Sequence, residues 1–461
     1  MERYETILIK NGTVVLGRDV VRKDLLVRGE KIAEVAGKIS CRADMTIDAD
    51  NLFVFPGAID NHVHFNDEFM ETISVHDYYT GTRAAAFGGV TCIIDFSNQK
   101  PGGSLIDTIT DKKREAQGKA LIDWGVHPVI TDPSETTINE IEDVVRQGSP
   151  TVKCYMTYRD EGLMIEKEDL VRISSRLEQE GGMLLLHAED NDMIEKGVTG
   201  MIESGNTGSF YHAKSRPPAV ERKAIDDAID ICRRSGGRVF IVHMSVSDGM
   251  GMLEDARAEG LNIHAETCTH YLVFDENMLA QHDGIKWICS PPLRDKGHQE
   301  ALWEGIADGR ISLVSSDDAA YSWEAKLLGK DRFDKCPNGI PGVEPRLNIL
   351  YSEGVAKERL SLTRFVELIS SEPAEMFGLS PDKGRLLPGS DADIVLFDPR
   401  IEWIMNNETL HMNTDWSAYE DINITGKIIK VFSRGELIID EKKCLAEKGR
   451  GRYLNRILNN E

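Results

Sequence analysis

Five groups of potential metal ligands are spread along the chain, and each stands at the end of a short apolar run that is typical of a β-strand. The runs cover residues 52–59, 151–152, 183–186, 239–242 and 311–314. The potential ligands are His62 with His64, Lys153, His187, His243 and Asp317. Residues that follow the strands of a closed α/β barrel converge at one mouth of it, although they lie far apart in the sequence. The pattern therefore predicts one shared site and a hydrolase with two metal ions.

The order of the predicted elements divides the chain into a barrel and a smaller β-domain. From residue 56 to 385, strand-like runs alternate with helical stretches such as 163–180, 219–235 and 250–259. This alternation predicts a parallel sheet, and at this length a closed (β/α)8 barrel of the TIM type. We expect residues 1–55 and 386–440 to pair as one small β-sandwich domain, because both segments read as strands.

The sequence also predicts turns near the N-terminus and a distinct tail at the C-terminus. Asn11-Gly12 and Gly29-Glu30 predict turns between the first strands. Residues 441–461 form a basic, glycine-rich C-terminal tail. The tail is expected to be an exposed arm with a role in subunit contact, or a disordered end.

Composition excludes several classes of function. The net charge of −23 argues against nucleic-acid binding, because phosphate contacts require a basic surface. No apolar run is long enough to cross a membrane, and the charged N-terminus does not resemble a signal peptide. The eight cysteines include no CxxC pair. We therefore expect a cytoplasmic protein with reduced thiols.

His62 and His64 are two residues apart at a strand end, so both imidazoles can point to the same side of the strand. Such a pair can hold one metal ion inside a barrel. Asp60, two residues earlier, is a candidate acceptor that orients one of the histidine rings, and its alternative is an ordinary acid at a strand end.

The segment from Pro56 to His64, Pro-Gly-Ala-Ile-Asp-Asn-His-Val-His, resembles the signature of the amidohydrolase superfamily. Lys153 in Val-Lys-Cys-Tyr-Met-Thr-Tyr is similar to the lysine of the cyclic-amidase branch, which includes dihydropyrimidinases and hydantoinases. In that branch carbon dioxide carboxylates the lysine, which then bridges two metals. His187 in Leu-His-Ala-Glu, His243 in Val-His-Met-Ser and Asp317 in Ser-Ser-Asp resemble the remaining ligands. The resemblance covers nearly the whole chain.

The carboxylation has a physical reason. A free lysine is a cation and cannot bind a metal, whereas its carbamate is an anion with two oxygens, suited to two cations about 3.5–4 Å apart. The alternative for Lys153 is a buried salt bridge. The resemblance implies that His62, His64, Lys153 and Asp317 hold one metal and that Lys153, His187 and His243 hold the other. Zinc is the expected metal, and manganese or cobalt could fill the same ligands.

The resemblance also implies the roles of single residues. A hydroxide between the metals attacks the amide, and Asp317 serves as general base and then returns the proton to the leaving nitrogen. Tyr158 is similar to the tyrosine that stabilises the oxyanion in dihydropyrimidinases and hydantoinases. Ser290 and Asn338 lie in segments that resemble those that bind the substrate ring in that branch. The alternative for each residue is a role in shaping its loop. Thr267 is a weaker candidate for lining the site.

Substrate size is expected to depend on the loops after the first and fourth barrel strands. Phe65, Phe69 and Met70 in the first loop, with Tyr155 and Tyr158 in the second, suggest an apolar wall for a ring substituent. Two further acids in the first loop, Asp67 and Glu68, face solvent or tune the pocket towards polar groups. Asp318 is expected to point away from the metals, because adjacent residues of a strand alternate in direction.

These features favour a dihydropyrimidinase or hydantoinase, which opens a dihydropyrimidine or hydantoin to an N-carbamoyl amino acid. The first loop has no arginine to bind the carboxylate of dihydroorotate. The alternative enzyme is an allantoinase. A non-catalytic scaffold similar to dihydropyrimidinase is disfavoured because every ligand is present, and a mononuclear deaminase because of Lys153. The resemblance implies a small cyclic amide or ureide as substrate and a homotetramer or homodimer.

Overall fold

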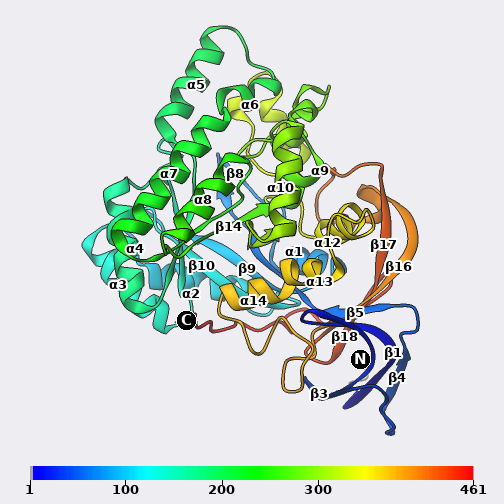
Figure 1. Cartoon of the computed structure of the whole chain (residues 1–461). Helices are drawn as coiled ribbons and strands as arrows, with labels where there is room; N and C mark the ends of the chain where they lie inside the picture. Colours follow the sequence, from blue (N-terminus) through cyan, green and yellow to red (C-terminus); the bar gives the residue numbers. More distant parts are fainter. Residues whose placement is uncertain (1–3, 460–461) are drawn as a thin grey trace.

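The computed structural model describes residues 4–459 as a barrel with a separate β-domain at one end (Figure 1). Residues 1–3, which begin the charged N-terminus, and residues 460–461, which end the predicted tail, lie outside the described part. The N- and C-terminal segments of the chain both contribute strands to the β-domain. The expected fold class, a TIM-like barrel with a domain built from both ends of the chain, is confirmed.

The barrel consists of eight parallel strands whose carboxyl ends carry the predicted ligands. Their order in the sheet is β15-β14-β13-β12-β11-β10-β9-β6. The two end strands approach each other through a bridge between Val63 and Asp318, so the sheet closes on itself. The bounds are β6 Ala58–Val63, β9 Val90–Asn98, β10 Asp123–Val129, β11 Thr151–Tyr155, β12 Met183–His187, β13 Arg238–Ile241, β14 Ile263–Cys268 and β15 Leu313–Ser315.

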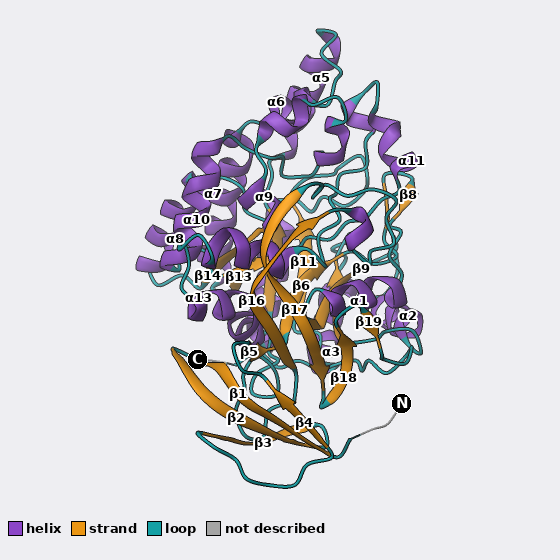
Figure 2. Cartoon of the chain, turned by 90° about the vertical axis from the view of Figure 1, so that its right-hand side faces the viewer, coloured by secondary structure: helices purple, strands orange, loops and turns teal. Residues whose placement is uncertain are grey.

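Helices surround this sheet and cover its outer face (Figure 2). The longer ones are α1 Tyr78–Phe87, α2 Leu105–Ala116, α3 Glu135–Arg146, α4 Lys167–Glu180, α5 Asn191–Glu203, α7 Pro218–Ser235, α8 Asp248–Ala258 and α10 Lys296–Asp308. The shorter ones are α6 Phe210–Ser215, α9 Thr269–Val273, α11 Trp323–Lys326, α12 Arg346–Leu350, α13 Leu362–Val366 and α14 Glu372–Met376. Across residues 4–459, no helix has the length and apolarity needed to cross a membrane.

Helix α4 illustrates how the sequence specifies these elements. It buries Leu170, Ile173 and Leu177 at intervals of three and four residues, which places them on one face. Each of these burials stabilises the fold by about 1.5–3 kcal/mol. The helix ends at Gly181, whose φ of 73° is a left-handed conformation that glycine adopts without strain. It begins at residue 167 rather than at 163 as predicted, because Met164 pairs with the end of β11.

The β-domain is a nine-stranded sheet, mostly antiparallel, that joins the two ends of the chain. Along it the strands run β19-β18-β17-β16-β5-β1-β2-β3, and β4 pairs with β1. The bounds are β1 Thr6–Leu16, β2 Asp19–Arg28, β3 Lys31–Ala36, β4 Met45–Asp48, β5 Phe53–Pro56, β16 Ile394–Met405, β17 Ile422–Ser433, β18 Glu436–Asp440 and β19 Lys443–Cys444. A separate hairpin, β7 Glu68–Phe69 with β8 Thr72–Ile73, lies in the loop after β6.

The turn predicted at Asn11-Gly12 is wrong, whereas the turn at Gly29-Glu30 joins β2 to β3 as expected. Strand β1 continues through Asn11, where the pairing with β2 shifts register. Asn11 adopts a φ of 62°, and its backbone N–H donates to Asp24 instead of to the ladder. The pair therefore forms a bulge, which inserts an extra residue without reversing the chain.

Across residues 441–459 the C-terminal tail packs against the rest of the chain, so the expectation of a free or disordered arm is wrong, while a role in subunit contact stays a prediction. The tail runs along the base of the barrel, where the Trp124 backbone N–H donates to the carbonyl of Arg452 (Figure 1). The Arg456 side chain is fully buried and donates to the carbonyl of Val126 at 2.6 Å. The tail therefore packs as part of the fold, because buried carbonyls at the base need donors.

Candidate active site

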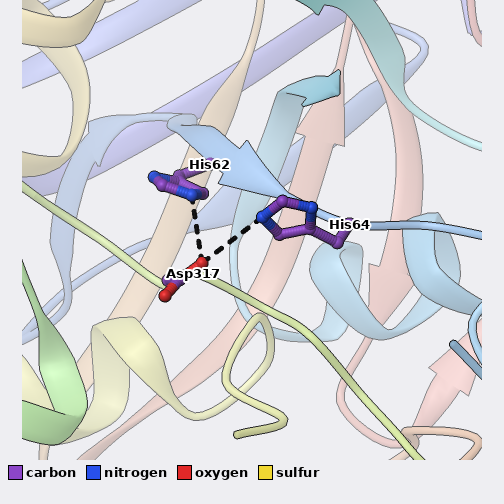
Figure 3. Close-up of side chains that lie close together, drawn as sticks. All are labelled: His62, His64 and Asp317. Carbon is purple, nitrogen blue, oxygen red and sulfur yellow. Dashed lines mark ion pairs between the residues drawn. The ribbon is translucent and has the colours of Figure 1, made fainter. Parts of the chain in front are cut away.

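His62, His64 and Asp317 meet at the carboxyl end of the barrel (Figure 3). Nε2 of His62 lies 3.0 Å from Oδ1 of Asp317, and Nε2 of His64 lies 3.5 Å from the same oxygen. One ligand atom from each residue lies within 4.8 Å of the other two. The contacts hold the pKa of the Asp317 carboxyl well below its ordinary value despite burial, so it is an anion at neutral pH.

This cluster has the properties of a metal site. His62 is fully buried, yet its Nε2 receives no hydrogen bond from any of residues 4–459, although Asp317 lies 3.0 Å away. The Nδ1 atom of buried His243 also lacks a hydrogen bond within residues 4–459. Buried nitrogens without partners cost free energy, and a divalent cation would satisfy their lone pairs. The donor set of imidazole nitrogen and carboxylate oxygen fits zinc.

Glu266 and Asp67 orient the two histidines of β6. Oε1 of Glu266 lies 2.5 Å from Nδ1 of His62, and Oδ2 of Asp67 lies 2.9 Å from Nδ1 of His64. Burial opposes protonation of His64, but Asp317 and Asp67 together raise its pKa to about 9 in the absence of a metal. Each carboxylate accepts from Nδ1 and leaves Nε2 directed towards Asp317, the usual arrangement around a metal-binding histidine.

These contacts correct the role expected for Asp60. Its carboxylate accepts from the backbone N–H of Ser316 and lies 3.5 Å from Arg346, so it does not orient a histidine ring. The sequence left open whether the two loop acids face solvent or the pocket. Asp67 faces the pocket, and Glu68 is exposed to solvent. The position of Asp67, three residues after His64, is the sequence feature from which its contact with the His64 ring could have been predicted.

Lys153 is fully buried in β11 and has no ion pair within the described residues 4–459, so the salt-bridge alternative is not supported. Its Nζ lies 5.0 Å from the ring centre of Phe96 and 4.9 Å from that of Tyr155. Burial lowers the pKa of its amine from 10.5 to about 8. An amine with this pKa is partly neutral near pH 7, and the neutral form can react with carbon dioxide.

His187 and His243 lie side by side, with ring centres 4.4 Å apart. Burial lowers the pKa of both imidazoles, and the neighbouring positive groups add to this effect for His243. Nε2 of His187 lies 2.8 Å from Glu189, which also pairs with Arg216. Both histidines are therefore neutral and suited to metal binding. Glu189 had been given no role from the sequence.

Tyr158 lies above the ligand cluster, with its ring centre 5.4 Å from that of His187. The Nδ2 group of Asn338 donates to the Tyr158 hydroxyl oxygen at 3.2 Å. Burial raises the pKa of this hydroxyl to about 12, so it stays protonated and can donate. Ser290 and Asn338 both line the pocket beside Tyr158, and Ser290 Oγ has no hydrogen-bond partner among residues 4–459.

The pocket at this site is walled by both apolar and polar groups. Its lining residues include all six predicted ligands together with Asp67, Phe69, Asn98, Tyr155, Tyr158, Leu163, Cys289, Ser290, Ala319, Tyr321, Asn338 and Gly339. Leu163 and Tyr321 were not expected from the sequence, because neither follows a ligand directly. Their positions depend on the paths of long loops.

Three residues proposed to line the site lie elsewhere. Phe65 is fully buried and packs edge-on against Tyr78, so it belongs to the core rather than to the substrate wall. Met70 lines a neighbouring hollow instead of the ligand pocket. Thr267 donates its hydroxyl to the Met244 carbonyl at 2.8 Å and does not line the pocket.

Asp318 points away from the ligands, as expected. Its Oδ2 lies 2.9 Å from Nδ1 of His76, and its Oδ1 accepts from the backbone N–H groups of Gly342 and Val343. The loop that supplies Asp317 is therefore held from behind by side-chain and backbone contacts.

Three of the site residues have left-handed backbone conformations. The φ angles of Tyr158, His243 and Asp317 are 66°, 41° and 49°. Such conformations cost a residue other than glycine about 1 kcal/mol or more. Strain of this kind is concentrated in functional sites, where the surrounding structure holds the side chain in one position.

Comparison with known proteins agrees with this geometry. The sequence profile of the amidohydrolase family matches residues 53–438. The chain is 37% identical to a D-hydantoinase of Geobacillus stearothermophilus, over 98% of this chain and 96% of the relative. It is 39% identical to a D-phenylhydantoinase of Escherichia coli, over 98% of both chains. The crystal structure of a dihydropyrimidinase from Brevibacillus agri superposes with a TM-score of 0.97 at 37% identity, covering 99% of this chain and 100% of that one.

Proposed function

The chain belongs to the amidohydrolase family, and within it to the hydantoinases; we propose that it opens the ring of a 5-substituted hydantoin or a dihydropyrimidine. Water adds to a ring carbonyl, the C–N bond of the amide breaks, and an N-carbamoyl amino acid is released. The observation that carries the proposal is the pocket that all six ligand candidates line together with Tyr158.

The ligand candidates suit two divalent cations. His62, His64, Lys153 and Asp317 would hold one, and Lys153, His187 and His243 the other, with the Lys153 amine carboxylated by carbon dioxide. We take zinc as the metal, because neutral imidazoles and carboxylate oxygens are its usual ligands in proteins. Cations held there would polarise the substrate carbonyl and lower the pKa of a water molecule towards neutrality.

Asp317 moves the proton that ring opening requires. Its low pKa keeps the carboxylate ionised, so a carboxylate oxygen can accept a proton from the attacking water. The same oxygen then returns the proton to the ring nitrogen, because an amide nitrogen leaves readily only when protonated. The strained backbone at Asp317 and the contacts behind Asp318 hold this carboxylate in position.

Tyr158 stabilises the negative charge that develops on the carbonyl oxygen. Its hydroxyl accepts from Asn338 and keeps its own proton free to donate to the oxyanion. A pKa of about 12 prevents loss of that proton at neutral pH. Ser290 and Asn338 would bind the alternating donor and acceptor groups of the ring edge.

The wall of the pocket favours a substrate with an apolar substituent. Phe69, Leu163 and Tyr155 line it together with Tyr158, and the rings of Phe69 and Tyr158 meet edge-on at 5.0 Å. Such a wall fits an aromatic or aliphatic group better than the polar ureido group of allantoin. The names of the relatives support a hydantoin of D configuration at the substituted carbon.

Turnover of a panel of rings tests this proposal. Zinc-loaded enzyme should open racemic 5-phenylhydantoin and release the N-carbamoyl product of the D enantiomer, as measured by chiral chromatography. Dihydrouracil should react more slowly and allantoin least. Preferential turnover of allantoin would instead support the allantoinase alternative, and no turnover of any ring would contradict cyclic-amide hydrolysis.

A further inference from the structure

A second group of potential metal ligands lies behind Asp317. It consists of Cys268, His270 and Asp317, whose ligand atoms all lie within 4.8 Å of one another. Cys268 ends strand β14, and His270 lies in the following helix α9. Asp317 is therefore shared between this group and the cluster that contains His62 and His64.

His270 is the second observation that points to a ligand here. Its side chain is 1% exposed, and neither ring nitrogen has a hydrogen-bond partner among residues 4–459. A buried imidazole without any partner is rare, because each unsatisfied polar atom costs about 1–3 kcal/mol. The His270 imidazole therefore lacks a partner that a cation could supply.

The spacing of the three ligand atoms suits a small cation. With bonds of about 2.0–2.3 Å, the ligand atoms of a tetrahedral zinc site lie about 3.3–3.7 Å apart. Because no two of the ligand atoms are more than 4.8 Å apart, the group needs to contract by at most about 1.5 Å to reach these separations. A sulfur, a nitrogen and an oxygen together favour zinc and softer divalent ions over magnesium or calcium.

We propose that Cys268, His270 and Asp317 form an inhibitory site for a thiophilic divalent cation, such as zinc in excess or cadmium. Binding releases the thiol proton to water and forms bonds to sulfur, imidazole nitrogen and the Asp317 carboxylate. The inhibitory effect rests on the proposed function, in which Asp317 carries the proton during ring opening. A carboxylate bound by this further cation cannot accept that proton.

The access route predicts slow inhibition. Cys268 is fully buried and does not line the pocket, whereas the Asp317 side chain is 13% exposed and does. The cation must therefore pass Asp317 to reach the sulfur. Cys289 is the competing target, because this cysteine does line the pocket.

Cadmium titration of the zinc-loaded enzyme tests the site. Two readouts are followed together: ultraviolet absorption from thiolate-to-cadmium charge transfer, and turnover of the ring substrate. Wild-type enzyme should bind one cadmium beyond its resident metals, gain the absorption and lose activity slowly. Cys268→Ser should lose both responses, and His270→Gln should weaken cadmium binding by roughly tenfold or more.

The controls separate the possible sources of a response. Cys41→Ser removes an exposed thiol and should leave both responses unchanged. Cys289→Ser should retain the slow inhibition, and its loss in that variant alone would overturn the proposal. Unchanged cadmium absorption in both Cys268→Ser and His270→Gln would also overturn it. If no ring is turned over, absorption and bound cadmium still test the site independently of the proposed function. If Cys268→Ser fails to fold, His270→Gln decides.

Discussion

Oε1 of Glu266 lies 2.5 Å from Nδ1 of His62, although the two residues are 204 positions apart in the sequence. Oε2 of the same carboxylate accepts from the side chain of Asn61, also at 2.5 Å. Glu266 is fully buried in strand β14 and reaches across the barrel interior to β6. One carboxylate therefore sets the orientation of His62, a proposed metal ligand, and of its neighbour Asn61.

Replacement of Glu266 by Gln should weaken metal binding without unfolding the protein. Gln keeps the shape of the side chain but removes the negative charge that supports Nδ1 of His62. Loss of such a supporting contact typically lowers metal affinity by about 10–100-fold. Competition with a chelator of known zinc affinity measures the change. Glu68→Gln is the matched control, because Glu68 is exposed in the loop after β6 and should bind zinc like the wild type. Equal affinity in both variants would contradict the role of Glu266.

Replacement of Lys153 by Ala should remove most bound metal and nearly all activity. The proposed bridge between the cations is lost, and the neighbouring histidines then lack a shared anion. Acetate or formate should restore part of the activity, because a small carboxylate fits the space left by the side chain. Metal content and turnover, each measured with and without added acetate, check this. Full activity in the variant without rescue would refute the two-metal account.

Carboxylation of Lys153, which releases one proton to water, should increase as the pH rises. Only the neutral amine reacts with carbon dioxide, and it predominates above the amine pKa, which burial lowers from 10.5 to about 8. At pH 7 this shift raises the neutral fraction of the amine by roughly 300-fold. Carbon-13 NMR of metal-free enzyme at constant dissolved ¹³CO₂ should show the carbamate signal growing between pH 7 and 9. A carbamate signal that is absent at pH 9 and appears only above about pH 10 would show that burial does not lower the pKa of this amine.

Replacement of Tyr158 by Phe should lower kcat by roughly 10²–10³, the usual effect of losing one oxyanion donor. KM should change much less, because the hydroxyl is proposed to act mainly in the transition state. Steady-state kinetics with 5-phenylhydantoin measures both constants. Tyr211→Phe, a partly buried tyrosine packed against the core away from the pocket, should behave like the wild type. An unchanged kcat in Tyr158→Phe would reduce this residue to a packing role.

Replacement of Arg456 by Met should destabilise the protein. The side chain is fully buried and donates to the carbonyls of Val126 and Phe377. Leaving those acceptors unsatisfied costs about 1–3 kcal/mol. Arg452→Met is the control, because the exposed ion pair of Arg452 with Glu30 contributes only about 0–1 kcal/mol. Thermal unfolding of both variants measures the difference, and equal midpoints would argue against a structural role for the tail.

Most of the fold could be predicted because its elements are specified locally. Leu170, Ile173 and Leu177 show the helical period of α4, and apolar runs mark the barrel strands. The errors arose where distant contacts decide the outcome. Arg456 is buried because the barrel base offers carbonyl acceptors, which composition does not indicate. Asn11 forms a bulge because its backbone N–H is satisfied by Asp24.

The same distinction applies to the site. The ligand candidates follow strands directly, so the order of the elements was enough to predict that they meet. Their supporting contacts depend on three-dimensional proximity. Glu266 reaches His62 across the barrel, and Leu163 enters the pocket from a loop. Asp60 occupied a plausible position in sequence but pairs with Arg346 instead.

The most direct test of the account is the number of metal ions per chain, measured by mass spectrometry on enzyme purified without chelator and compared with turnover of 5-phenylhydantoin. The account predicts two ions per chain and D-selective ring opening, with both lost together when a chelator removes the metals and restored by zinc with bicarbonate. Full turnover by a chain that retains one ion or none would contradict it.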